Sequence, residues 1–179
     1  MKIKFFPIIL IIIFFIIFII FYKGLQNSNI YTPTVNIQKK IPVFETKIFN
    51  TNDNINSDKI FESKKFYIMN IWSSWCVPCR EEHSFLMDLS SNNNIEIIGL
   101  NYKDENINAK NFLKELGSPY NLILSDTDGT IAIEWGAYGV PETFLIYDKE
   151  IIKKIVGPLN KYSLEEIKKL IKKIILNFL

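Results

Sequence analysis

The feature that most constrains the fold of this chain is the placement of its only two cysteines, Cys76 and Cys79. They directly follow an apolar run of strand length, residues 65–72, and directly precede a predicted helix, residues 78–90. Free backbone N–H groups and the positive dipole end at a helix N-terminus stabilise a thiolate and lower the pKa of a cysteine there. The strand-turn-helix order predicts Cys76 as an attacking thiolate and Cys79 as the thiol that resolves a mixed disulfide.

Other uses of the two cysteines fit this sequence poorly. A zinc ion could take Cys76, Cys79 and His83, the only histidine, but no second pair of ligands closes a tetrahedral site, and we expect His83 to be a partly exposed helix residue. Covalent haem attachment needs a histidine directly after the second cysteine, where Arg80 stands. A static disulfide across so short a loop would constrain the unfolded chain very little. We therefore expect a redox-active dithiol without a metal or other cofactor.

The N-terminal run of residues 5–22 reads FFPIILIIIFFIIFIIFY and contains no charge. As a helix at about 1.5 Å per residue it would span roughly 27 Å, enough for a bilayer core. No small-residue cleavage site follows it, which favours an uncleaved anchor over a cleaved signal peptide or a buried helix. Lys2 and Lys4 before the run, against Lys23 after it, predict a cytoplasmic N-terminus. In a bacterium the remaining chain would then be periplasmic, where disulfides persist.

The charged residues are also unevenly distributed along the chain. The 179 residues carry 21 basic and 19 acidic side chains, whereas residues 24–160 carry 13 basic and 17 acidic ones, a net charge of −4. A mildly acidic centre lacks the basic footprint of a nucleic-acid-binding protein. We expect a transmembrane anchor over residues 1–22, a periplasmic tether over 23–42, with a short lead-in strand as the alternative, and one domain over 43–179.

Strand and helix patterns alternate after Pro42, which predicts an α/β fold with a mixed sheet flanked by helices. The last helix carries its lysines on the face opposite its apolar positions, as expected for a helix packed on a sheet; association of those lysines with a membrane surface is the alternative. The predicted strands are residues 42–49 at a sheet edge, 65–72, 95–102, 122–124, 143–147 and 151–156, and the predicted helices are residues 78–90, 109–116 and a terminal helix opened by a capping box at Ser163 and Glu166.

Five segments between residues 42 and 170 carry a resemblance to a known family: WCVPCREEH, GLNYKDE, FLKELGSPY, DTDG and GAYGVPETFLIYDKE. Together they resemble the CcmG family, also called DsbE, of membrane-anchored thioredoxin-like proteins in bacterial cytochrome c maturation. The resemblance implies a thioredoxin-like fold with a βα-type insertion. It also implies a cis peptide at Pro141 opposite the dithiol, which would leave the backbone of Val140 free to pair with an extended substrate. We expect Trp75 to shield the sulfurs and to pack beneath that substrate.

The resemblance further implies a function and partners. Members act as periplasmic reductants of apocytochrome c, or of its CcmH-type maturation partner, and are themselves re-reduced through a transmembrane thiol carrier of the CcdA or DsbD type. Because the direction of electron flow depends on the reduction potential, a DsbA-like oxidant remains an alternative. A peroxidase and a non-catalytic module that only binds apocytochrome also stay open at this point.

Two acids accompany the dithiol in the family pattern, Glu82 on the predicted helix and Glu142 directly after the cis-proline position. Asn70 stands where thioredoxins bury an aspartate, and an amide cannot accept a proton from Cys79. We hypothesise that Glu82 or Glu142 accepts that proton. The alternative hypothesis leaves both glutamates as solvated surface acids.

Overall fold

The computed structural model describes residues 6–26 and 39–177, and the chain divides into two compact units, residues 1–34 and 35–179. The first unit contains the helix α1 (Phe6–Gln26), on which every residue from Ile8 to Tyr22 is large, hydrophobic and 47–71% exposed. Within the described residues, no helix has both the length and the apolar character that crossing a membrane requires. The predicted basic flank at Lys2 and Lys4 and most of the predicted tether lie outside the described residues.

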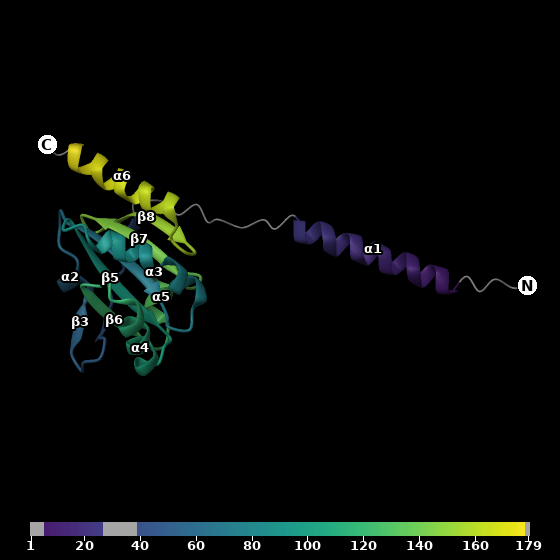
Figure 1. The fold of residues 1–179 in the computed structure, drawn as a ribbon, viewed down its shortest axis with the longest axis horizontal. Coiled ribbons are helices and arrows are strands. Elements are labelled where there is room, and N and C mark those ends of the chain that lie inside the picture. The colour runs from purple at the N-terminus through teal and green to yellow at the C-terminus, as the bar shows by residue number, and fades with distance from the viewer. Residues whose placement is uncertain (1–5, 27–38, 178–179) are drawn as a thin grey trace, which may run out of the picture. The chain divides into compact units, whose positions relative to one another are not determined.

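Among residues 39–177, eight strands form one mixed sheet in the order β1-β8-β7-β4-β5-β6-β2-β3 (Figure 1). The central strands β4, β5 and β6 are parallel, and the other neighbouring pairs are antiparallel. Parallel neighbours need crossover connections, which α3 and α4 provide. The strands are β1 (Lys39–Lys40), β2 (Glu45–Ile48), β3 (Asn54–Asn56), β4 (Phe66–Trp72), β5 (Ile95–Tyr102), β6 (Leu122–Asp126), β7 (Glu142–Tyr147) and β8 (Glu150–Val156).

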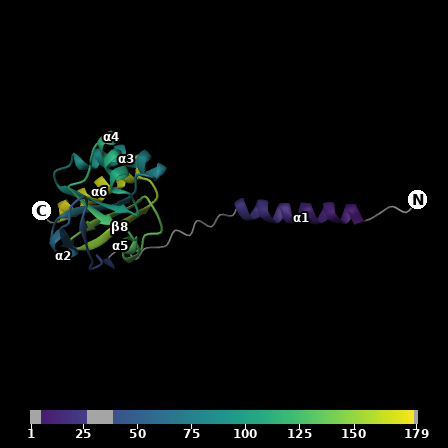
Figure 2. The ribbon, with the colours of Figure 1, turned by 90° about the horizontal axis from the view of Figure 1, so that it is seen from below.

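Helices cover both faces of this sheet. Figure 2 shows α3 and α4 on one side and α2 and α5 on the other. The terminal helix α6 packs on the α3 side, because apolar side chains of the two helices share one buried cluster. The helices are α2 (Ser57–Ile60), α3 (Val77–Ser90), α4 (Asn106–Leu116), α5 (Thr130–Glu134) and α6 (Lys161–Asn177).

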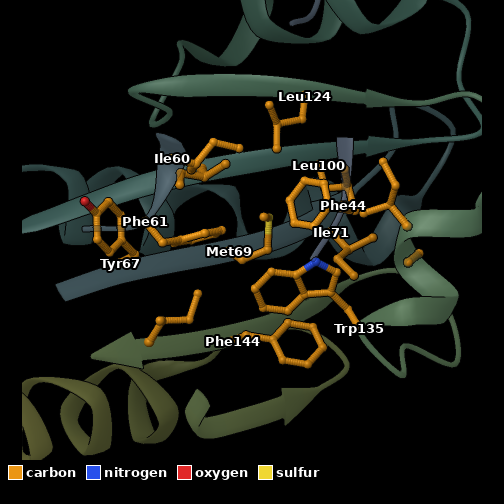
Figure 3. Packing of buried hydrophobic residues seen from close by; sticks show 14 of the residues in the cluster. Phe44, Ile60, Phe61, Tyr67, Met69, Ile71, Leu100, Leu124, Trp135 and Phe144 are labelled. Atoms are coloured by element: carbon orange, nitrogen blue, oxygen red, sulfur yellow. The ribbon is translucent and has the colours of Figure 1, made fainter. Parts of the chain in front are cut away.

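Strand β4 shows why the sheet needs cover on both faces, since all of its residues are buried. Its side chains alternate between the faces. Met69 and Ile71 point into the cluster drawn in Figure 3, where they meet Trp135 from the α5 side. Ile68 points to the opposite face and joins the cluster that α3 and α6 complete. Asn70 follows Ile68 on that opposite face, so its amide is buried on the same side as α3.

The mixed sheet flanked by helices is confirmed, and β5 has the bounds predicted from the sequence. The helix predicted over residues 109–116 begins three residues earlier, as α4. The prediction of an edge strand near residues 42–49 is wrong, because β3 pairs with the outer side of β2. β1 lies inside the predicted tether and matches the lead-in strand alternative. The unpredicted helices α2 and α5 are too short for a helical period to be recognised.

The start of α6 also differs from its prediction. Asn160 precedes the helix, and its Oδ1 accepts a hydrogen bond from the Ser163 N–H at 3.0 Å, while the Ser163 Oγ accepts one from the Asn160 N–H at 2.8 Å. This is a reciprocal cap in which Ser163 is the third helical residue. Glu166 instead pairs with Lys153 on β8, with 2.6 Å between Oε1 and Nζ. The predicted capping box is therefore wrong by three residues.

Candidate active site

The two cysteines lie at the N-terminus of α3, as predicted, and form a disulfide. Cys76 is the N-cap residue, and its Sγ accepts a hydrogen bond from the Cys79 N–H at 3.1 Å. The first helical turn contains Pro78 and no acidic residue. The Cys79 N–H and the positive end of the helix favour a thiolate on Cys76 once the disulfide is reduced. In the disulfide form Cys76 and Cys79 are 4% and 2% exposed, so they differ little in shielding.

The segment before the dithiol is held by the chain that follows β5. Asp104 accepts hydrogen bonds from the N–H and the hydroxyl of Ser74, at 2.6 and 2.7 Å. The indole N–H of Trp75 donates to the Lys103 carbonyl at 3.0 Å, and the Trp75 side chain is 58% exposed beside the dithiol. Sequence reasoning missed Asp104, although the carboxyl ends of parallel strands such as β4 and β5 meet at one sheet edge and offered a signal for it.

The loop before β7 carries the expected cis peptide, between Val140 and Pro141. Val140 is partly buried and packs against the cluster that contains Cys76 and Cys79. The residue just before the cis-proline therefore belongs to the packing around the dithiol. Three residues were predicted to line a substrate groove: Val140 and Pro141 lie on this loop, and Trp75 directly precedes Cys76.

Glu82 lies on α3 one turn after Cys79 and is fully buried. Its Oε1 accepts a hydrogen bond from Asn70 Nδ2 at 2.8 Å, and its Oε2 accepts one from the Leu159 N–H at 2.7 Å. Burial raises the pKa of Glu82 from 4.5 to about 7, although both hydrogen bonds act to lower it. The alternative that Glu82 is a solvated surface acid is wrong. A carboxyl group with this pKa can both accept and return a proton at neutral pH.

Glu142 is also buried, but it lies on the opposite face of the sheet, because the next residue of β7, Thr143, points to the α3 face. Lys154 Nζ lies 2.7 Å from Glu142 Oε2, but the angles are not those of a hydrogen bond, so the contact is an ion pair. The two side chains are almost fully buried, with Lys154 3% and Glu142 1% exposed. Glu142 Oε1 accepts from the Tyr138 N–H at 2.6 Å, and Lys154 donates to the Gly136 carbonyl at 2.7 Å. Glu142 is therefore no surface acid either, and the pair ties the loop before β7 to β8.

His83 is buried rather than partly exposed, which corrects the prediction. Its Nε2 lies 3.0 Å from the Gly117 carbonyl oxygen, and its ring meets the ring of Phe112 edge-on. Burial lowers the pKa of His83. Across the described residues, no group of three or more His, Cys, Asp or Glu side chains is arranged to hold a metal ion.

Comparison with known proteins finds relatives of similar sequence. The family described as Redoxin matches residues 37–171. The thiol:disulfide interchange protein DsbE of Escherichia coli (strain K12) is 39% identical over 131 residues, which cover 73% of this chain and 70% of DsbE. The thiol:disulfide interchange protein CycY of Rhizobium leguminosarum bv. viciae is 46% identical over 103 residues, 57% of this chain and about half of CycY (55%).

Solved structures agree on the fold. A putative DsbE from Chlorobium tepidum superposes with a TM-score of 0.65 at 20% identity, covering 77% of this chain and 96% of that protein. A putative thioredoxin from Neisseria meningitidis superposes with a TM-score of 0.61 at 21% identity, covering 73% and 89%. The predicted thioredoxin-like fold is thus confirmed. With the dithiol at the head of α3 and these sequence matches, the chain belongs to the Redoxin family, among the DsbE thiol:disulfide interchange proteins.

Proposed function

We propose that this protein is a periplasmic reductant of the disulfides of apocytochrome c, or of a CcmH-type partner, during the maturation of c-type cytochromes. The observation that carries the proposal is the Cys76–Cys79 pair at the N-terminus of α3. Val140 packs against the cluster that contains the pair, and the buried Glu82 lies one turn beyond Cys79. A thiolate site beside the loop that carries Val140 suits an extended polypeptide that carries a disulfide.

In the proposed reaction the Cys76 thiolate attacks one sulfur of the substrate disulfide. A mixed disulfide forms and one substrate thiolate leaves. Cys79 then loses its proton and attacks the Cys76 sulfur, which releases the second substrate thiolate and forms the Cys76–Cys79 disulfide. The substrate gains two electrons and two protons, and a transmembrane thiol carrier of the CcdA or DsbD type must restore the dithiol.

Glu82 is the better placed of the two glutamates to accept the proton of Cys79. Residues three apart on a helix are surface neighbours, and both side chains lie on the buried face of α3. The raised pKa of Glu82, about 7, allows it to take the proton during resolution and to release it afterwards. Glu142 instead faces the other side of the sheet and is paired with Lys154.

Trapping tests the function directly. A Cys79→Ser variant of the full-length protein, expressed in cells, should accumulate mixed disulfides on Cys76 that contain apocytochrome c or a maturation partner. The matched Cys76→Ser variant should trap neither. Recovery of unrelated envelope proteins alone would indicate a broad reductase and would contradict the assigned substrate.

Two measurements separate the alternatives. A reduction potential near that of thioredoxin, about −270 mV, supports a reductant, whereas a potential near that of DsbA, about −120 mV, would reverse the direction. Full cytochrome assembly with a Cys76→Ala, Cys79→Ala double variant would favour a non-catalytic binding module.

The proposed location is the outer side of the bacterial inner membrane, held by the apolar segment of residues 5–22 with the N-terminus in the cytoplasm. Support comes from the uncharged sequence of this segment and from the exposed hydrophobic side chains of α1. The full-length protein should stay with membranes during alkaline carbonate extraction and should be digested when protease is added to spheroplasts. Release by carbonate would contradict the anchor.

A further inference from the structure

A tyrosine from outside the dithiol region reaches the hydrogen bonds of Glu82. Tyr120 lies between α4 and β6, and its hydroxyl donates to Asn70 Oδ1 at 2.9 Å. Asn70 Nδ2 in turn donates to Glu82 Oε1 at 2.8 Å and to Thr143 Oγ1 at 3.0 Å. The chain of contacts therefore runs from Tyr120 through one amide to the buried carboxyl group.

The orientation of the Asn70 amide decides whether it supports a carboxylate. One end of an amide donates and the other accepts, while an ionised carboxylate only accepts. The Thr143 hydroxyl can act as donor or acceptor, so it selects neither orientation. Burial raises the pKa of Tyr120 well above 10, so its hydroxyl keeps its hydrogen. A flipped amide would leave that buried hydrogen without its acceptor, which is unfavourable.

Packing holds the Tyr120 ring at this place. The ring stacks on Trp72, with 5.4 Å between ring centroids and 19° between the planes. On the neighbouring strand, Gly99 leaves room for the ring, because a Cβ there would lie 2.9 Å from Tyr120 Cδ1. The packing of the ring thus holds the Tyr120 hydroxyl within hydrogen-bond distance of Asn70.

We propose that Tyr120 is a positioning residue that holds the Asn70 amide with its NH₂ group toward Glu82 and so favours the carboxylate form of Glu82. The orientation itself depends only on the contacts above. Its consequence for turnover rests on the proposed function, in which Glu82 accepts the proton of Cys79.

The groups around Glu82 allow a change in its titration to be attributed to Tyr120. Strands β4 and β7 contribute the uncharged Asn70 and Thr143, and the segment before α6 contributes the Leu159 N–H. The titratable groups nearby are the phenol of Tyr120 and, on α3 itself, Cys79 and His83. In the disulfide form neither cysteine titrates, so Glu82 can be followed without them.

The test is a Tyr120→Phe variant of the full-length protein in detergent micelles. The side-chain carboxyl carbon of Glu82, labelled with ¹³C and assigned with Glu82→Gln, is titrated in the disulfide form. Its midpoint should move to higher pH. The rate of disulfide reduction at pH 7 should fall about threefold, as expected for one weakened hydrogen bond, and should approach the parent rate at higher pH.

Tyr67→Phe is the matched control, since Tyr67 is a buried tyrosine on the opposite face whose hydroxyl accepts from the Glu62 N–H at 3.1 Å. It should leave the Glu82 midpoint unchanged. An unmoved midpoint in Tyr120→Phe, or an equal movement in Tyr67→Phe, would overturn the positioning role. A moved midpoint with an unchanged pH profile of the rate would support the positioning of Asn70 and overturn the proton transfer to Glu82.

Discussion

The two buried glutamates, Glu82 on α3 and Glu142 on β7, have the same side chain and opposite surroundings. Glu82 lies on the α3 face, where its hydrogen-bond donors are an amide and a backbone N–H, and burial raises its pKa to about 7. Glu142 lies on the other face, next to the ammonium group of Lys154. Burial alone therefore does not decide what a carboxyl group does. The neighbouring charge makes the difference: Glu82 has uncharged neighbours and suits proton transfer, whereas Glu142 is paired with a cation and fixes a loop.

The largest expected effect comes from breaking the Glu142 ion pair. Lys154→Met would leave a buried carboxyl group without its cation, which typically costs about 3–5 kcal/mol of unfolding free energy. Urea unfolding at neutral pH measures this loss. The neighbouring Lys153→Met variant is the control, since Lys153 forms a half-exposed pair with Glu166 and should cost less than about 1 kcal/mol.

A second change tests the cause of that loss. Adding Glu142→Gln to Lys154→Met removes the unpaired charge and should recover much of the stability. Equal losses for Lys153→Met and Lys154→Met, or no recovery in the double variant, would mean that Glu142 does not depend on its cation.

The second-largest expected effect is a dependence of the unfolding free energy on pH, caused by Glu82. Its pKa is 4.5 in the unfolded chain and about 7 in the folded protein, so the folded state binds more protons between these values. The stabilising contribution of Glu82 should be fully present below pH 4.5 and should decline as the pH rises through this window, by up to about 3 kcal/mol. Urea unfolding of the disulfide form at pH 4.5 and pH 8 measures the decline.

The control for this prediction is Glu82→Gln, in which the decline should disappear. His83 acts in the opposite direction, because its lowered pKa makes the unfolded state bind more protons, but it is common to both proteins. An identical pH dependence in the parent and Glu82→Gln would show that the pKa of Glu82 is close to that of an exposed glutamate.

The smallest effect concerns catalysis by Glu142. If this residue only fixes the loop before β7, Glu142→Gln should lower the rate of disulfide reduction by about threefold at every pH between about 6 and 9. The amide oxygen can still accept from the Tyr138 N–H, and the loss reflects a loop loosened by the missing ion pair with Lys154. Glu82→Gln should instead remove the dependence of the rate on pH near 7. A changed pH profile in Glu142→Gln would assign proton transfer to Glu142 and would erase the contrast between the two acids.

Much of the fold was predictable because its signals are local. The apolar run at residues 65–72 and the period of residues 78–90 place the strand and the helix around Cys76 and Cys79, and only the exact ends differ. Predictions failed where the answer depended on a partner strand or a distant side chain. The strand near residues 42–49 shows this, since its apolar pattern contains no information about whether β3 will pair with its outer side.

The sequence by itself determined that a dithiol stands at the start of a helix, because two cysteines three apart after an apolar strand have few other arrangements. Only the tertiary structure decided the surroundings of the two buried acids, Glu82 and Glu142. Asn70 and Tyr120 are fifty residues apart, and Glu142 and Lys154 meet through the register of two paired strands. A pKa depends on desolvation and on the nearest dipoles and charges, and those are set by which segments pack together rather than by neighbours along the chain.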